Sequence, residues 1–233
     1  MNLFYSPHIE GDVFLLNENE SKHAVRVLRL ALGSRVVLVD GRGGWYEATI
    51  LEDHPKRCLL KIDSFTSNYR PLSYHLHLAI SPTKNMDRFE WFLEKATEIG
   101  ISTITPLLCH RTERRNLKPE RLEKVLISAM KQSLKAYLPV FNPAEKIGDF
   151  LALEREGTKG IAHCYPTDRK GINDLDRTGH YTMLVGPEGD FTEAEINAAL
   201  QAGFAPFHLG QSRLRTETAG VYICTAVSLL SNI

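Results

Sequence analysis

Residues Leu184–Thr192 read LVGPEGDFT, and this stretch decides the fold of the chain. It runs from an apolar strand, Tyr181–Val185, through a turn of glycine and proline, into a helix that begins at the capping box Thr192–Glu195. Open α/β sheets bind their ligands at the carboxyl ends of such strands. The Gly-Pro-Glu-Gly turn holds more glycine than packing requires, so it predicts a ligand-binding loop rather than a plain βα turn.

A second loop of the same kind lies further along the chain, where Leu209–Ala219 reads LGQSRLRTETA. It connects a short strand, Phe207–Leu209, to an apolar helix over Thr216–Leu230. Arg213, Arg215 and Glu217 flank the helix N-terminus, where free N–H groups and the positive end of the dipole lie. The stretch predicts a second part of the ligand site. The alternative is a solvated surface with Glu217 as a dipole partner.

Strands and helices alternate through the rest of the C-terminal region. Further strands are expected at Tyr74–Ile80, Ile101–Pro106 and Ile161–His163. One helix presents an apolar face and ends at Gly100, and another begins at Pro119. The expected buried positions of these two helices are Phe89, Phe92, Leu93, Ala96 and Ile99, then Leu122, Val125, Leu126, Ala129 and Ser133. This alternation predicts an α/β domain over residues 72–233, with a mostly parallel sheet and helices on both faces.

The N-terminal region reads instead as a small β-barrel over residues 1–68. Val36–Val39 and Trp45–Ile50 form a hairpin around the glycine turn Asp40–Gly44, and Cys58–Ile62 is a third strand. The glycine turn imitates a dinucleotide fingerprint, but β-formers follow it instead of a helix. A short helix is expected over Ser21–Leu28 with Ser21 as its cap. Phe65–Pro71 is the expected linker.

The charge of the chain is balanced, with 28 Lys and Arg against 28 Asp and Glu, so any nucleic-acid contact must be local. Residues 110–136 carry eight Lys or Arg against three Glu. Three residues near the N-terminus also recur three apart, as on one helical face. These segments are either RNA-facing surfaces or ordinary solvated helix faces. The RNA-binding candidates are His23, Arg26, Arg29, Arg111, Arg114 and Arg115.

Several classes of function are not supported. The sequence has no phosphate-loop motif, no nucleophile elbow and no HExxH pair. Its four cysteines are far apart, so we expect neither a metal site nor a disulfide framework. The chain shows neither a signal-peptide pattern nor an apolar run of membrane-spanning length. We therefore expect a cytoplasmic protein without a membrane association.

The two loop motifs in this order resemble the family of 16S ribosomal RNA uridine-N3 methyltransferases (RsmE-like) of the SPOUT knotted superfamily. Shorter stretches support the resemblance along nearly the whole chain. They are His23–Leu30, Asp40–Gly43, Glu94–Gly100, Ile104–Pro106 and Lys131–Ser133.

The resemblance implies a trefoil-knotted C-terminal domain and an N-terminal PUA-like barrel that helps to bind RNA. It further implies S-adenosylmethionine as the cofactor, a homodimer, and 16S rRNA in the 30S subunit as the substrate. The positions that match the family's cofactor-site motifs are Leu184, Gly186, Glu188, Gly189, Leu209, Gly210, Leu214, Arg215 and Thr216.

Methylation at N3 of a uridine needs loss of the N3 proton, which places negative charge on the carbonyl oxygens of the base. Arg213 or Arg215 could stabilise that charge. A free glutamate, with a pKa of about 4.3, is a poor base, so Glu188 or Glu217 could serve only if burial raises its pKa. The catalytic candidates are thus Arg213, Arg215 and Glu217. Because N3 lies on the pairing edge, the target base must be unpaired or extruded.

The sequence departs from the family pattern in two places. Asp190 stands where the family usually has a third glycine, and Gln211–Arg213 replaces a more apolar stretch. A carboxylate before a helix is favourable, so we expect Asp190 to be tolerated. Two alternatives remain open. One is a different RNA methyl transfer of the same superfamily, to a ribose 2′-oxygen or guanine N1. The other is a catalytically silent RNA-binding module of ribosome assembly.

Overall fold

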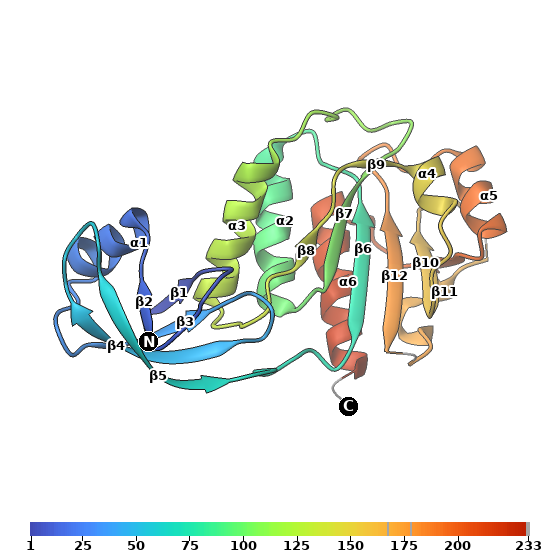
Figure 1. Ribbon diagram of the computed structural model, residues 1–233. Coiled ribbons are helices and arrows are strands. Elements are labelled where there is room, and N and C mark those ends of the chain that lie inside the picture. The colour runs from blue at the N-terminus through green and yellow to red at the C-terminus, as the bar shows by residue number, and fades with distance from the viewer. Residues whose placement is uncertain (167, 178, 232–233) are drawn as a thin grey trace. The chain divides into compact units, whose positions relative to one another are not determined.

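The computed structural model describes residues 1–166, 168–177 and 179–231, and these form two compact units (Figure 1). The first unit comprises Met1–Pro71 together with Met130–Leu138. The second comprises Leu72–Ala129 and Pro139–Ile233. The chain therefore returns to the first unit after the second has begun, which the sequence pattern did not predict.

The first unit is built on a five-stranded sheet of order β1-β3-β4-β5-β2. The strands are β1 (Leu3–Tyr5), β2 (Val13–Leu15), β3 (Arg35–Val39), β4 (Trp45–Glu52) and β5 (Leu59–Thr66). The predicted hairpin is confirmed as β3 and β4, which pair antiparallel from Val39 opposite Trp45. The Asp40 carboxylate closes the turn by accepting hydrogen bonds from the backbone N–H groups of Arg42 and Gly44, at 2.7 and 2.9 Å.

The N-terminal helix differs from the prediction. It consists of α1 (Glu18–Lys22) and the π-helix η1 (His23–Val27), and its cap is Asn17 instead of Ser21. Ser21 lies buried inside the helix, where its hydroxyl donates to the carbonyl of Leu16 and accepts from the N–H of Cys58. The wider π-helical turn ends before Arg29, whose φ is 54°. The expectation that His23, Arg26 and Arg29 share one regular helical face was wrong.

Residues 130–138 close one side of the first unit. Met130 and Ala136 are buried against Leu3, Val37 and Trp45. The backbone N–H of Gly43 donates to the carbonyl of Ala136, and that of Leu138 donates to the carbonyl of Gly41, at 3.0 and 2.9 Å. The first unit therefore draws part of its core from a segment far along the sequence.

The second unit contains an eight-stranded sheet in which every described pair of strands is parallel, as predicted. The main path runs β11-β13-β10-β12-β6-β7-β8, and β9 pairs with β7. The strands are β6 (His75–Ile80), β7 (Thr103–Leu108), β8 (Val140–Phe141), β9 (Glu145–Lys146), β10 (Thr158–Ala162), β11 (Lys170–Gly171), β12 (His180–Val185) and β13 (Ala205–His208).

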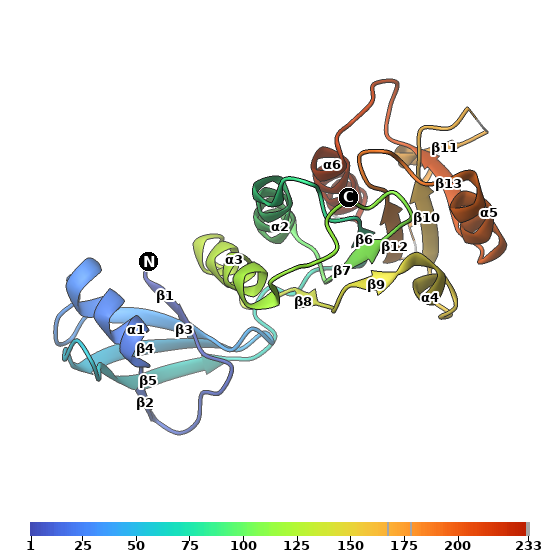
Figure 2. The ribbon, with the colours of Figure 1, turned by 90° about the horizontal axis from the view of Figure 1, so that it is seen from above.

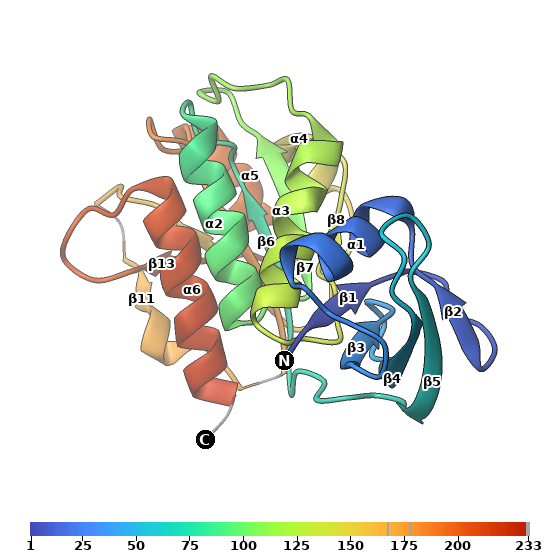
Figure 3. The ribbon, with the colours of Figure 1, turned by 90° about the vertical axis from the view of Figure 1, so that its left-hand side faces the viewer.

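Helices cover both faces of this sheet (Figure 2). On one face α2 (Met86–Ile99) packs beside α6 (Thr216–Ser231), as Figure 3 also shows. On the other lie α4 (Ile147–Leu151) and α5 (Glu193–Gln201). Neighbouring strand residues alternate between the faces, so Ala79 packs in the α4 and α5 core whereas Ile80 faces Gly220 of α6. The remaining helices are α3 (Pro119–Gln132) and the 3₁₀ turn η2 (Ile172–Asp174).

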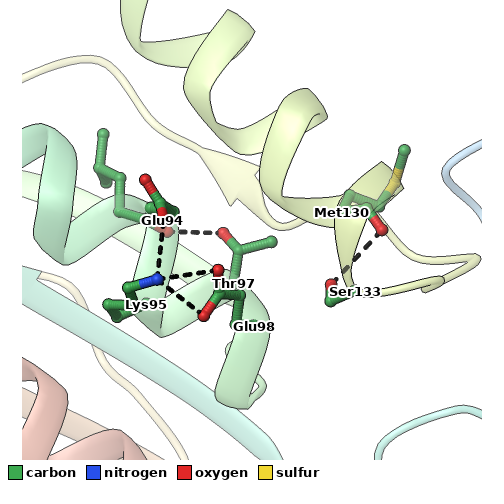
Figure 4. Close-up of polar contacts among 7 residues, drawn as sticks. Glu94, Lys95, Thr97, Glu98, Met130 and Ser133 are labelled. Carbon is green, nitrogen blue, oxygen red and sulfur yellow. Dashed lines mark hydrogen bonds and ion pairs between the residues drawn. The ribbon is translucent and has the colours of Figure 1, made fainter.

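The stretch Glu94–Gly100, one of those that resemble the methyltransferase family, forms the last turns of α2 and its C-terminal cap (Figure 4). Lys95 binds the carboxylates of Glu94 and Glu98 at 2.7 and 3.0 Å, and the Thr97 hydroxyl donates to the carbonyl of Leu93. These contacts hold the helix rather than form a site. No helix in the described part of the chain is long and apolar enough to cross a bilayer.

Candidate functional site

A cavity of about 670 Å³ lies at the carboxyl edge of the parallel sheet in the second unit. It is formed by the loops that follow three adjacent strands, β12, β10 and β13. The carboxyl edge of a parallel sheet is where α/β proteins bind ligands. The lining comprises residues 162–166, Arg169, residues 185–190, residues 207–210, residues 212–216 and Ala219.

The structure brings together the two loops that the sequence singled out. Thr216, the first residue of α6, donates a buried hydrogen bond from its hydroxyl to the carbonyl of Gly186, at 3.0 Å. Eight of the nine predicted cofactor residues line the cavity. The exception is Leu184, which is fully buried in the core between the sheet and α5, in the same cluster as Phe191.

The second half of the Gly-Pro-Glu-Gly loop is held by contacts with two other segments of the chain. The Glu188 carboxylate accepts a hydrogen bond from the backbone N–H of Lys84, at 2.9 Å. The guanidinium of Arg111 donates to the carbonyls of Gly189 and Phe191, at 2.6 and 3.3 Å. Arg111, which was predicted to bind RNA, therefore stabilises the cavity loop through hydrogen bonds to its backbone. The loop is thus shaped before any ligand enters.

Asp190 adopts a left-handed backbone conformation, with φ at 63°. Glycine reaches this region without a steric penalty, and Asp is among the few other residues that visit it. The departure from the family's third glycine is thereby explained. The Asp190 carboxylate also accepts hydrogen bonds from the N–H groups of Cys164 and Phe191, both at 2.8 Å. It ties the β12 loop to the β10 loop.

The β10 loop is the part of the cavity that sequence reasoning missed. His163 is 4% exposed, and neither of its ring nitrogens has a hydrogen-bond partner among the described residues. Burial lowers the pKa of His163, and nearby Asp190 partly offsets this effect. The only signal in the sequence was the position of His163 at the end of a predicted strand.

The three catalytic candidates are placed differently. Arg213 and Arg215 are exposed side chains that line the cavity. Glu217 is buried and does not line it. One carboxylate oxygen of Glu217 lies 3.8 Å from the guanidinium of Arg88, and the other has no hydrogen-bond partner among the described residues.

The remaining RNA-binding candidates are mostly exposed. Arg26 and Arg29 are exposed, and His23 is half-buried. Arg114 and Arg115 line a smaller pocket of about 330 Å³ with Lys84, Glu113 and Asn116. Arg115 also donates to the carbonyls of Cys109 and His110. Among the residues described, no three His, Cys, Asp or Glu side chains are grouped so as to hold a metal ion.

Comparison with known protein families gives two matches. The RNA methyltransferase domain family matches residues 70–228, and the PUA domain of RNA methyltransferases matches residues 16–63. Among curated proteins, ribosomal RNA small subunit methyltransferase E of Aquifex aeolicus is 26% identical over all of both chains. The protein of that name from Synechocystis is 30% identical, covering 88% of this chain and 69% of that protein.

Solved structures agree along the whole chain. A "probable rRNA-methyltransferase" from Porphyromonas gingivalis is 39% identical with a TM-score of 0.93, covering 100% of this chain and 99% of that one. A ribosomal RNA small subunit methyltransferase E from Neisseria gonorrhoeae, solved with bound S-adenosyl methionine, is 28% identical with a TM-score of 0.90. It covers 99% of this chain and 98% of that one.

Proposed function

Since this chain belongs to the RNA methyltransferase family, we propose that it transfers a methyl group from S-adenosylmethionine to N3 of a uridine in 16S rRNA. The observation that carries the proposal is that both motif loops line the same cavity and are joined by the Thr216–Gly186 hydrogen bond. Relatives named ribosomal RNA small subunit methyltransferase E match it over nearly their whole length, which supports the small-subunit substrate.

The cavity fits S-adenosylmethionine in size and chemistry. Its volume of about 670 Å³ lies within the usual range for small-molecule sites, roughly 300–1,000 Å³. Gly210 leaves open space beside its backbone, and Gly186 would bring an added Cβ to 3.1 Å from Phe191. The open space beside Gly210 lets a ligand approach the main chain there, whereas Gly186 lets the turn pack closely against Phe191. The cofactor supplies an electrophilic methyl group on a sulfonium, and Gly186, Gly189, Leu209, Gly210 and Leu214 would hold it.

Arg213 and Arg215 are the groups that we assign to charge stabilisation. Both are exposed at the rim of the cavity, where an extruded base can reach them. A guanidinium near the uracil oxygens would stabilise the anion formed when N3 loses its proton. The excess of positive charge would also favour the ionised base over the neutral one.

Glu217 is assigned a supporting role beside these arginines. Its carboxylate is buried next to Arg88 and outside the cavity lining, so it is poorly placed to take a proton from the substrate. We propose that it holds the start of α6, and with it Thr216 and Arg215, in position. Glu188, whose carboxylate binds the Lys84 backbone, is the remaining candidate for a base.

We assign RNA binding to residues 1–68 and methyl transfer to residues 72–233. The PUA match supports the first assignment, with Arg26 and Arg29 as exposed basic side chains. Arg114 and Arg115, at the smaller pocket, are proposed phosphate contacts within the second region. Arg111 remains a candidate contact, although its guanidinium already binds backbone carbonyls.

We further propose a homodimer that works in the cytoplasm, where its ribosomal substrate is assembled. Trp91 of α2 and Tyr222 and Leu229 of α6 are exposed on adjacent helices, which supports a subunit contact there. The trefoil knot is proposed from the resemblance alone. General rules of chain topology disfavour knots and would not predict one here.

The test is methyl transfer from radiolabelled S-adenosylmethionine to 30S subunits that lack the modification, followed by mass spectrometry of the rRNA nucleosides. Label in 3-methyluridine is the expected result. Label in a 2′-O-methylated nucleoside or in 1-methylguanosine would replace the uridine-N3 assignment by another RNA methyl transfer. Failure to bind the cofactor and to transfer label to subunits or naked RNA would favour the silent RNA-binding module.

A further inference from the structure

Resting on the proposed cofactor, we infer that His163 is a specificity residue that hydrogen-bonds the neutral adenosine half of S-adenosylmethionine. The starting observation is that its buried ring makes no hydrogen bond with the described residues. His163 lines the cavity and is 4% exposed, yet both ring nitrogens lack a hydrogen-bond partner among the described residues. A buried polar side chain without a partner is costly, so native proteins rarely keep one unless a ligand or water completes it.

The backbone around His163 is held by hydrogen bonds on two sides. The Asp190 carboxylate accepts a hydrogen bond from the N–H of Cys164, at 2.8 Å. The guanidinium of Arg169 donates to the carbonyl oxygen of His163. Neither contact uses the imidazole. The loop therefore places at the cavity wall a buried ring whose donor and acceptor both lack a partner among the described residues.

The charge state of the ring selects the part of the cofactor that it meets. Burial, opposed by Asp190 and reinforced by Arg169, lowers the pKa of His163, so the ring is neutral near pH 7. A neutral imidazole offers one donor and one acceptor. The ribose hydroxyls and the adenine edge need such partners, whereas the ammonium and carboxylate of the methionine half need charged ones. Apolar neighbours in the lining, Ala162, Val185 and Phe207, suit the same neutral half.

The test compares three probes by calorimetry: S-adenosylmethionine, S-adenosylhomocysteine and 5′-methylthioadenosine, which lacks the amino-acid group. With His163→Ala, all three affinities are expected to fall by a similar factor, about tenfold for one lost hydrogen bond. His163→Asn and His163→Gln each restore one ring nitrogen's position, and the variant that regains affinity identifies the nitrogen used. His110→Ala, an exposed histidine outside the cavity, is the matched control.

A loss confined to probes that carry the methionine half would overturn the assignment to adenosine. Unchanged affinity for all three in His163→Ala would overturn the inference while leaving the proposed function intact. If the wild-type protein itself bound no S-adenosylmethionine, the proposed function would fail first. A second readout is the nitrogen-15 resonance of His163, assigned by its absence in His163→Asn. It should shift on addition of 5′-methylthioadenosine but not of methionine.

Discussion

The hydroxyl of Thr216 donates a buried hydrogen bond to the carbonyl of Gly186, 30 residues earlier in the chain. This bond joins the two motif loops that line the cavity. Thr216→Val keeps the shape of the side chain but leaves the Gly186 carbonyl without this donor. We expect a loss of about 1–3 kcal/mol in the free energy of unfolding, with weaker cofactor binding. Urea unfolding and calorimetry measure both, and Thr216→Ser, which retains the hydroxyl, should stay near wild type.

At position 190, substitution by glycine should destabilise the protein less than substitution by alanine, which is the reverse of the usual order. Both substitutions remove the hydrogen bonds to Cys164 and Phe191, but only alanine must still hold a Cβ at a φ of 63°. That conformation costs roughly 1–2 kcal/mol for a non-glycine residue. Asp190→Gly should therefore be more stable than Asp190→Ala, and both less stable than wild type. Equal unfolding midpoints for the two variants would contradict the strain argument.

Arg111 should support the cofactor loop even when no RNA is present. Arg111→Ala removes the hydrogen bonds to the Gly189 and Phe191 carbonyls and loosens the Gly-Pro-Glu-Gly turn. Cofactor affinity measured without RNA should fall about tenfold. Arg114→Ala is the control, because among the described residues the Arg114 side chain makes a single, long hydrogen bond, to the Lys84 carbonyl at 3.5 Å. A defect seen only when RNA is added would return Arg111 to a purely RNA-binding role.

His77 should make the protein less stable in acid. Burial, together with the nearby Arg155 and His75, lowers the pKa of His77 to about 4. Because the folded-state pKa lies below the unfolded value of about 6.5, the unfolded chain takes up the proton first. The stabilisation is complete above pH 6.5 and is lost as the pH falls toward 4, by up to about 3 kcal/mol.

The measurement for His77 is the free energy of unfolding between pH 7 and pH 4. His77→Asn should flatten this dependence relative to wild type. It will not abolish it, because burial also lowers the pKa of His75 and His163. Identical slopes for the wild type and His77→Asn would show that His77 does not control the transition.

Glu217 and Arg88 should behave as a coupled pair. Glu217→Ala removes a buried carboxylate at the start of α6 and should impair turnover or cofactor binding. Arg88→Met should also destabilise the protein, because it leaves the Glu217 charge buried without a cation. The double variant Glu217→Gln with Arg88→Met should be less damaged than the sum of the single changes. Full activity of Glu217→Ala would remove this residue from the mechanism.

Local patterns predicted much of the second unit. The capping box at Thr192 and Glu195 forms as expected, with the Thr192 N–H donating to the Glu195 carboxylate at 2.8 Å. The apolar face of α2 is buried at Phe89, Phe92 and Ala96. Such features depend on residues a few positions apart, which a sequence displays directly.

The β10 loop could not be predicted in the same way. His163 enters the cavity because β10 lies between β12 and β13, and this order arises from pairing between distant segments. The π-helical turn at His23–Val27 was hidden for a related reason: its side-chain spacing does not differ clearly from that of an α-helix over so few residues. The position of Met130–Leu138 in the first unit likewise depends on tertiary packing alone.

That last feature has a consequence for synthesis. N-terminal domains commonly fold while the remainder of the chain is still being made. Here Met130 and Ala136 form part of the core around Trp45, and Ala136 and Leu138 pair with the turn at Gly41 and Gly43. The first unit cannot complete its core until residue 138 has emerged from the translating ribosome. By then α2, β7 and α3 have already been made, so the first unit can be completed only after part of the second has been synthesised.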